Sequence, residues 1–120
     1  MKDLTDDERE EMIKFCVDLI RIPSPPGEEE KCAEAVKAEM VRLNYDDVWR
    51  DKAGNIVGLV RGEDPDSPKV MLNSHMDHVD VGDVEEWRYP PFGGEIHDGR
   101  IYGRGASDNK GAIAVQVHAL

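Results

Sequence analysis

Apolar residues recur at helical spacing near the N-terminus and predict a first helix. Thr5 and Glu8 have the spacing of a capping box, so this helix should begin there and continue to about Arg21. Pro23 should end it, because proline has no amide hydrogen and its ring clashes with the preceding turn, and residues 22–27 should form a rigid turn. One apolar stripe lines the predicted helix: Met12, Cys16, Leu19 and Ile20, with Phe15 at its margin.

A second apolar stripe predicts a helix that begins near Glu28 and ends near Asn44. Three consecutive glutamates, at positions 28 to 30, suit the positive end of a helix dipole. The residues of the stripe are Cys32, Ala33, Val36, Met40 and Leu43.

Short apolar or alternating runs predict strands after these helices. Asp98-Gly99 between two alternating runs is a strong signal for a β-hairpin, because both residues accept the positive φ that a tight turn requires. A loop rich in proline and aspartate precedes the apolar run Val70-Met71-Leu72, which resembles a buried strand. The first predicted strand starts at Val48. The other predicted strands cover residues 56–60, 69–73, 95–97 and 100–102.

The last predicted helix, Lys110 to Leu120, is apolar on more than one side, with Ile113, Val117 and Leu120 on one face. A helix of this kind needs cover from neighbouring elements. We therefore expect the chain to be cut within a larger domain, and we expect exposed apolar surface around residues 113–120 to make the isolated chain associate.

Composition describes one well-charged globular domain. The 120 residues include 26 acidic and 15 basic ones, for a formal net charge of −11. Such a charge repels phosphate backbones, so nucleic acid is not expected as a partner. No apolar run approaches the roughly 20 residues that span a bilayer, and the acidic N-terminus lacks the apolar core of a signal peptide. We expect a cytoplasmic protein that does not bind membranes.

The two cysteines, Cys16 and Cys32, both fall in predicted helices. They lack the C-x-x-C spacing of a redox or metal motif. We interpret them as reduced residues that pack in the core.

A candidate for chemistry lies at His75 and Asp77, directly after the predicted strand at 69–73. In extended backbone, residues two apart project to the same side, so the imidazole and the carboxylate can share one volume. A carboxylate on one ring nitrogen fixes the tautomer and leaves the other nitrogen free for a metal. A hydrogen-bonded structural histidine is the alternative. His78 is a second possible ligand but should point away from Asp77, whereas His97 and His118 are expected to be structural or at the surface.

A second carboxylate, Asp108, lies in a glycine-framed turn between Gly103 and Gly111. A dinucleotide fingerprint would need glycine at position 108, a phosphate-binding loop would need Gly-Lys-Ser/Thr, and a nucleophile elbow would need glycines two residues either side of Ser107. None of these patterns is present. Asp108 is therefore either a carboxylate presented on a sharp turn for chemistry or the cap of the following helix.

Together these stretches resemble the two-zinc amidohydrolases and exopeptidases, a group that includes acetylornithine deacetylase, succinyl-diaminopimelate desuccinylase, carboxypeptidase G and aminoacylase. The resemblance covers nearly the whole chain. Ile22-Pro23-Ser24 and Gly54-Asn55 also fit the N-terminal pattern of that group. The segments that carry the resemblance are Ser74-His75-Met76-Asp77, then Trp87 with Pro91-Phe92, then residues 98–111.

The resemblance implies an α/β fold, a three-layer α/β/α sandwich with a central mixed sheet, of which residues 1–120 would be the N-terminal part of the catalytic domain. By motif, His75 would ligate one metal, Asp108 would bridge two, and Asp77 would orient His75. The metals would be zinc, with cobalt or manganese as substitutes. The resemblance also implies a cis peptide bond between Asp108 and Asn109.

The chain departs from the family pattern after Asp108. The remaining metal ligands and the paired glutamates that contain the general base lie farther along in the family, and no Asp or Glu follows Asp108 here. We also expect the smaller lid and dimerisation domain, through which the parent family is often homodimeric, to be absent from residues 1–120. The first hypothesis is a zinc-dependent hydrolase of amide or peptide C–N bonds, acting on N-acyl amino acids or small peptides, with this chain inactive alone. The alternative is a noncatalytic fold fragment, or a half-enzyme that needs a partner chain.

Overall fold

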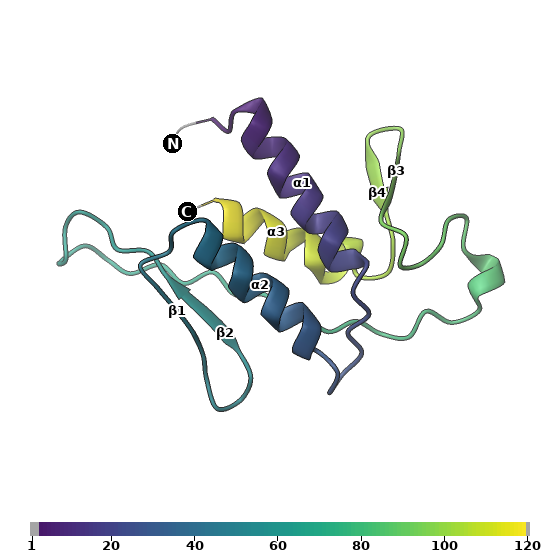
Figure 1. Ribbon diagram of the computed structural model, residues 1–120, viewed down its shortest axis with the longest axis horizontal. Coiled ribbons are helices and arrows are strands. Elements are labelled where there is room, and N and C mark those ends of the chain that lie inside the picture. The colour runs from purple at the N-terminus through teal and green to yellow at the C-terminus, as the bar shows by residue number, and fades with distance from the viewer. Residues whose placement is uncertain (1–2, 120) are drawn as a thin grey trace.

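The computed structural model describes residues 3–119 and contains three helices and two small antiparallel sheets (Figure 1). Among these residues, no helix has the length and apolar character needed to cross a membrane. In chain order the elements are α1 (Asp6–Ile20), α2 (Glu30–Arg42), β1 (Asp47–Arg50), β2 (Ile56–Leu59), the 3-10 turn η1 (Val84–Glu86), β3 (Glu95–His97), β4 (Arg100–Tyr102), the irregular turn η2 (Ala106–Lys110) and α3 (Gly111–His118).

Helix α1 begins with the capping box that the sequence predicts. The Thr5 amide donates to Glu8 Oε2 at 2.7 Å, and the Glu8 amide donates to Thr5 Oγ1 at 3.2 Å. Two amides that lack partners within the helix are thereby satisfied. Helix α2 begins at Glu30, where no side chain caps it, and ends at Arg42, so the predicted bounds were slightly too wide.

The core lies where the three helices meet, with α3 between α1 and α2 (Figure 1). The expectation of exposed apolar surface on the last helix was wrong for Ile113 and Val117, which are covered by α1 and α2. Val117 is only 3% exposed and Ile113 is also buried, whereas Val115 faces solvent at 55% exposure. Leu120, the third residue of the predicted face, lies outside the described residues. The buried cluster comprises Phe15, Cys16, Leu19, Ile20, Cys32, Val36, Ile113, Ala114 and Val117.

Each sheet is a pair of antiparallel strands. In the first sheet Asp47 pairs with Leu59 and Arg50 with Ile56. In the second, Glu95 pairs with Tyr102, and the turn holds Asp98 at φ 51° and Gly99 at φ 72°, so the hairpin predicted from Asp-Gly is confirmed. The α/β class is confirmed as well. Within residues 3–119 no sheet has more than two strands.

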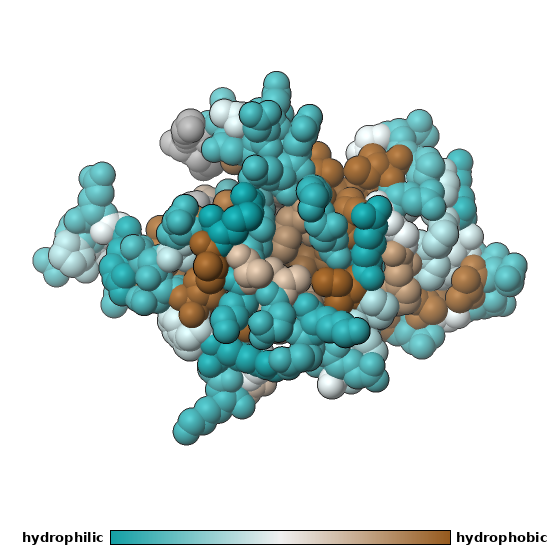
Figure 2. All heavy atoms as spheres, in the orientation of Figure 1, coloured by the Kyte–Doolittle hydropathy of each residue, from teal (hydrophilic) through white to brown (hydrophobic). Residues whose placement is uncertain are grey.

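The segment at residues 69–73 differs from its predicted strand. It leads to His75 as expected, but no other described segment pairs with it. Its side chains are consequently exposed, Val70 at 85% and Met71 at 86%. An apolar run forms a buried strand only when a neighbouring strand accepts its hydrogen bonds and other elements cover its side chains. Figure 2 shows hydrophilic residues over much of the viewed face, with apolar residues reaching the surface in several separate places.

Candidate functional site

The imidazole of His75 lies between two carboxylates. His75 Nδ1 is 3.1 Å from Asp77 Oδ1 and 3.2 Å from the Asp77 carbonyl oxygen. His75 Nε2 is 2.9 Å from Asp108 Oδ1, although 33 positions separate these two residues in the chain. The structure thus brings together all three residues that the sequence singled out, with one carboxylate facing each ring nitrogen.

The site is open to solvent. The His75 side chain is 48% exposed and the Asp108 side chain 86%. Partial burial disfavours the imidazolium, but the hydrogen bond to Asp108 and the negative charges of both carboxylates outweigh it and raise the pKa of His75 above its ordinary value. A proton on the imidazole of His75 is therefore stabilised by this arrangement.

A sharp turn presents Asp108 to His75. Gly105 precedes the turn with φ 81°, a conformation that residues with a Cβ rarely adopt, and the Lys110 amide closes the turn on the Gly105 carbonyl at 2.8 Å. Asp108 itself leaves helical geometry, at φ −132° and ψ 87°. The peptide bond between Asp108 and Asn109 is cis, as the family resemblance implied. Asp108 therefore does not act as a simple helix cap.

His78 does not join His75. It is buried, its Nε2 accepts a hydrogen bond from the Ser24 amide at 2.8 Å, and its Nδ1 donates to the Val79 carbonyl at 2.9 Å. Both ring nitrogens are therefore engaged by the backbone. This arrangement leaves no ring nitrogen free and fits a structural histidine.

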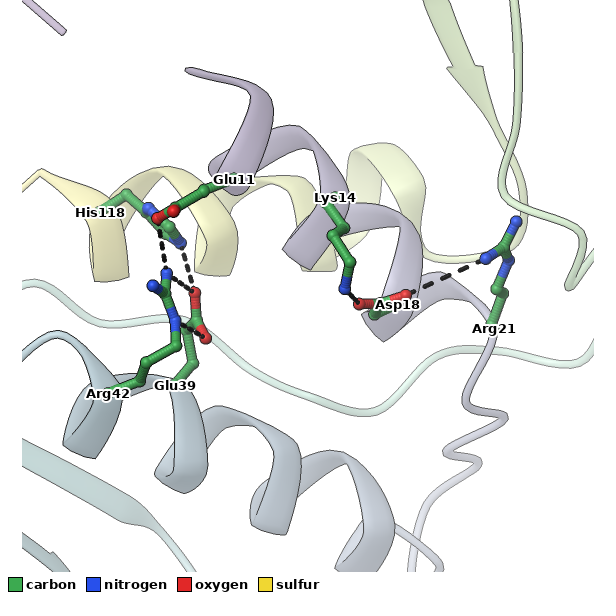
Figure 3. A network of polar contacts seen from close by, with 7 residues as sticks. All are labelled: Glu11, Lys14, Asp18, Arg21, Glu39, Arg42 and His118. Carbon is green, nitrogen blue, oxygen red and sulfur yellow. Dashed lines mark hydrogen bonds and ion pairs between the residues drawn. The ribbon is translucent and has the colours of Figure 1, made fainter. Parts of the chain in front are cut away.

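The other two histidines also have the structural or surface character that was expected. His97 pairs with Glu95 at 2.8 Å and stacks on Tyr89 with ring centroids 3.9 Å apart. His118 contacts Glu39 at 3.0 Å in a polar network between α1, α2 and α3 (Figure 3). Hydrogen bonds from Arg42, with smaller help from His118, lower the pKa of Glu39 in that network.

Sequence reasoning missed Ser24 and Lys110. Both are fully buried, and the Lys110 ammonium donates to the carbonyls of Leu19 at 2.9 Å and Ile22 at 2.6 Å. Burial lowers the pKa of Lys110. A lysine at the start of an otherwise apolar helix was the one available signal. Cys16 and Cys32 are free thiols in the core, as expected.

The donor set at the site is small. Within residues 3–119, no cluster of three or more His, Cys, Asp or Glu side chains is arranged to hold a metal ion. The atoms that face each other are His75 Nε2 and Asp108 Oδ1. Asp77 contacts the other ring nitrogen, Nδ1. These residues could therefore provide two ligands to a metal ion and a carboxylate that orients one of them.

Known proteins resemble this chain over nearly its full length. It is 34% identical over 113 residues to an uncharacterized protein, YgeY, of Escherichia coli strain K12, and equally to the protein of that name in Escherichia coli O157:H7. These alignments cover 94% of the chain but 27% of each relative, so the chain spans about a quarter of their length. Residues 71–120, which include His75, Asp77 and Asp108, match the model of peptidase family M20/M25/M40.

Proposed function

We propose that this chain carries part of the metal centre of a metal-dependent hydrolase of the M20/M25/M40 type. The reaction would be hydrolysis of an amide or peptide C–N bond in an N-acyl amino acid or a small peptide. The observation that carries the proposal is the contact between His75 Nε2 and Asp108 Oδ1 at 2.9 Å, with Asp77 on the other ring nitrogen. The family match over residues 71–120 supports the same reading.

The facing atoms suit a shared metal ion. Two ligand atoms bound to one tetrahedral zinc at about 2.0–2.1 Å each are separated by roughly 3.3 Å, so the present 2.9 Å needs only a small opening. Imidazole with carboxylate favours zinc, with cobalt or manganese as substitutes. His75 and Asp108 would be the ligands that this chain supplies, and Asp108 would be the one shared by two ions. A bound metal would polarise the scissile carbonyl and lower the pKa of a bound water.

Asp77 is proposed as the residue that orients the ligand. With its carboxylate and carbonyl oxygens both near His75 Nδ1, Asp77 would hold a ring proton on Nδ1 and leave Nε2 as the nitrogen available to a metal. That tautomer is the one that binds a metal through Nε2. His75 must lose its second proton before it can do so, because the imidazolium has no lone pair to offer.

The chain alone should not catalyse hydrolysis. Two ligand atoms leave most coordination positions of a metal ion to water. The second candidate, a half-enzyme that works with a partner chain, is favoured by the exposed apolar residues Val70 and Met71. In either case we propose a small-molecule or peptide substrate and a cytoplasmic location; the net charge of −11 disfavours nucleic acid.

Calorimetric titration with zinc tests this proposal on the purified chain. The chain should bind zinc weakly, and His75→Ala or Asp108→Ala should lower the affinity about tenfold or more. His97→Ala is the matched control, because His97 forms another partly exposed histidine–carboxylate pair, with Glu95. Zinc binding that is unchanged in both site variants, or that is lost only in His97→Ala, would refute the proposal.

A further inference from the structure

Three polar residues are buried in the described part of the chain, and all three meet at one turn. They are Ser24, His78 and Lys110, and the turn is residues 22–24, directly after α1. A buried polar group costs free energy unless it is hydrogen-bonded. The hydrogen bonds of these three residues at a single turn therefore indicate a specific structural role. Two of the three lie close in sequence to the proposed metal ligands.

The first set of contacts joins the turn to the segment that carries His75. Ser24 Oγ donates to the Met76 carbonyl at 2.7 Å, and the Ser24 amide donates to His78 Nε2 at 2.8 Å. The His78 amide returns a hydrogen bond to the Ser24 carbonyl at 3.2 Å. Ser24 is thus bonded on both sides of Asp77, and one of its acceptors is the residue directly after His75.

These contacts matter because the His75 segment lacks the support of a sheet. Residues 69–83 pair with no described strand. Upstream of His75, the segment is tied to α3 by Ser74 Oγ, which donates to Gln116 Oε1 at 2.7 Å, and by Gln116 Nε2, which donates to the Asn73 carbonyl at 3.3 Å. Downstream, Ser24 provides the anchor. His75 is therefore held between two fixed points.

The second set of contacts joins the same turn to Asp108. The ammonium of Lys110, two residues after Asp108, donates to the carbonyls of Leu19 and Ile22. The Leu19 carbonyl, near the C-terminal end of α1, also accepts from the Ile22 amide at 3.1 Å, and a cation at this end of a helix is favoured by the helix dipole. The amide of Lys110 also closes the turn that presents Asp108. Lys110 thus fastens this turn to the end of α1.

We propose that Ser24, His78 and Lys110 are positioning residues, which hold His75 and Asp108 at contact distance by anchoring both of their segments to residues 22–24. None of the three forms a hydrogen bond with His75 Nε2 or Asp108 Oδ1. The distance between His75 Nε2 and Asp108 Oδ1 is a property of the metal-free chain. A role of this distance in catalysis rests on the proposed metal-dependent function.

Proximity in the metal-free chain is the first measurement. Nuclear Overhauser effects between the ring protons next to His75 Nε2 and the β-protons of Asp108 report it directly. We expect them to weaken in Ser24→Ala and Lys110→Met, which remove the donors, and to recover in Ser24→Thr, which keeps the hydroxyl. For His78, Gln keeps an acceptor near the position of Nε2 whereas Leu does not, so His78→Gln should retain more of the signal than His78→Leu.

Zinc affinity is the second measurement, made by calorimetry on the same variants. We expect Ser24→Ala and His78→Leu to lower it about tenfold, the loss typical of removing a group that orients a ligand. The control is Val36→Ala, which creates a cavity in the core cluster but removes none of these hydrogen bonds. It should lower the urea midpoint and leave both the proximity signals and the zinc affinity unchanged.

The outcomes separate the two proposals. Proximity signals that persist in Ser24→Ala, or that fall equally in Val36→Ala at matched stability, would overturn the positioning role. Signals that fall as expected while the parent chain binds no zinc would support positioning and refute the metal-dependent function. If Lys110→Met does not fold, the Ser24→Ala and Ser24→Thr pair decides the positioning role alone.

Discussion

His75 Nε2 contacts Asp108 Oδ1 at 2.9 Å across 33 positions of sequence. His75 lies on a segment that pairs with no described strand, and Asp108 lies on the irregular turn η2. Neither a sheet nor a regular helix therefore sets the distance between them. The contact is the centre of the proposed site. It also makes the protonation of His75 a direct probe of whether the two residues meet in solution.

Replacing Asp108 should change the protonation of His75. In Asp108→Asn the negative charge next to Nε2 is removed, so the pKa of His75 should fall from its raised value toward that of an ordinary histidine. An NMR titration of the ring protons measures this in the metal-free chain. Glu95→Gln, which removes the carboxylate beside His97, is the control and should leave the His75 titration unchanged. The same His75 pKa in parent and Asp108→Asn would show that the contact does not form.

The raised pKa of His75 also predicts a dependence of stability on pH. Because the folded pKa lies above the unfolded one, the pair stabilises the fold fully below the unfolded value of about 6.5 and loses this effect as the pH rises through the folded pKa. The site is half exposed, so the effect should stay below about 1 kcal/mol. Urea unfolding of parent and His75→Gln at about pH 5.5 and about pH 8.5 tests it. A larger difference between the two proteins at the higher pH would contradict the sign.

Two valines on α3 offer a matched test of the core. Val117 is 3% exposed and Val115 is 55% exposed. Val117→Ala should lower the free energy of unfolding by about 2 kcal/mol, from lost burial and the cavity that remains, whereas Val115→Ala should change it by less than about 0.5 kcal/mol. Equal losses in denaturant unfolding would mean that α3 is not packed as described.

Association of the isolated chain should depend on residues 70–72. Val70 and Met71 are exposed on an extended segment whose backbone pairs with no described strand, a combination that favours intermolecular contacts. Val70→Lys with Met71→Glu should reduce concentration-dependent association in sedimentation velocity. Val115→Lys, on the exposed side of α3, is the control and should not. A parent chain that stays monomeric at high concentration would contradict this prediction.

Features set by neighbours in sequence could be predicted. The capping box of Thr5 and Glu8, the hairpin at Asp98-Gly99 and the turn after Ile20 all follow from local conformational preferences. Only the resemblance to a known family predicted that His75 and Asp108 belong to one site. Local conformational preferences do not relate residues that are 33 positions apart.

Features that depend on distant partners could not be predicted. Residues 69–73 have the composition of a buried strand, but no described segment pairs with them. The anchoring roles of Ser24 and Lys110 arise from contacts that span 52 and 88 positions, to Met76 and Ile22 respectively. A serine in a proline-rich turn and a lysine before a helix both have ordinary surface explanations when read alone.

Anomalous diffraction at the zinc edge, from zinc-soaked crystals of the chain, shows whether His75 and Asp108 share a metal ion. We expect an anomalous peak within about 2.0–2.2 Å of both His75 Nε2 and Asp108 Oδ1. A peak bound only by other residues, or no peak at His75 while zinc is bound elsewhere on the chain, would contradict this expectation.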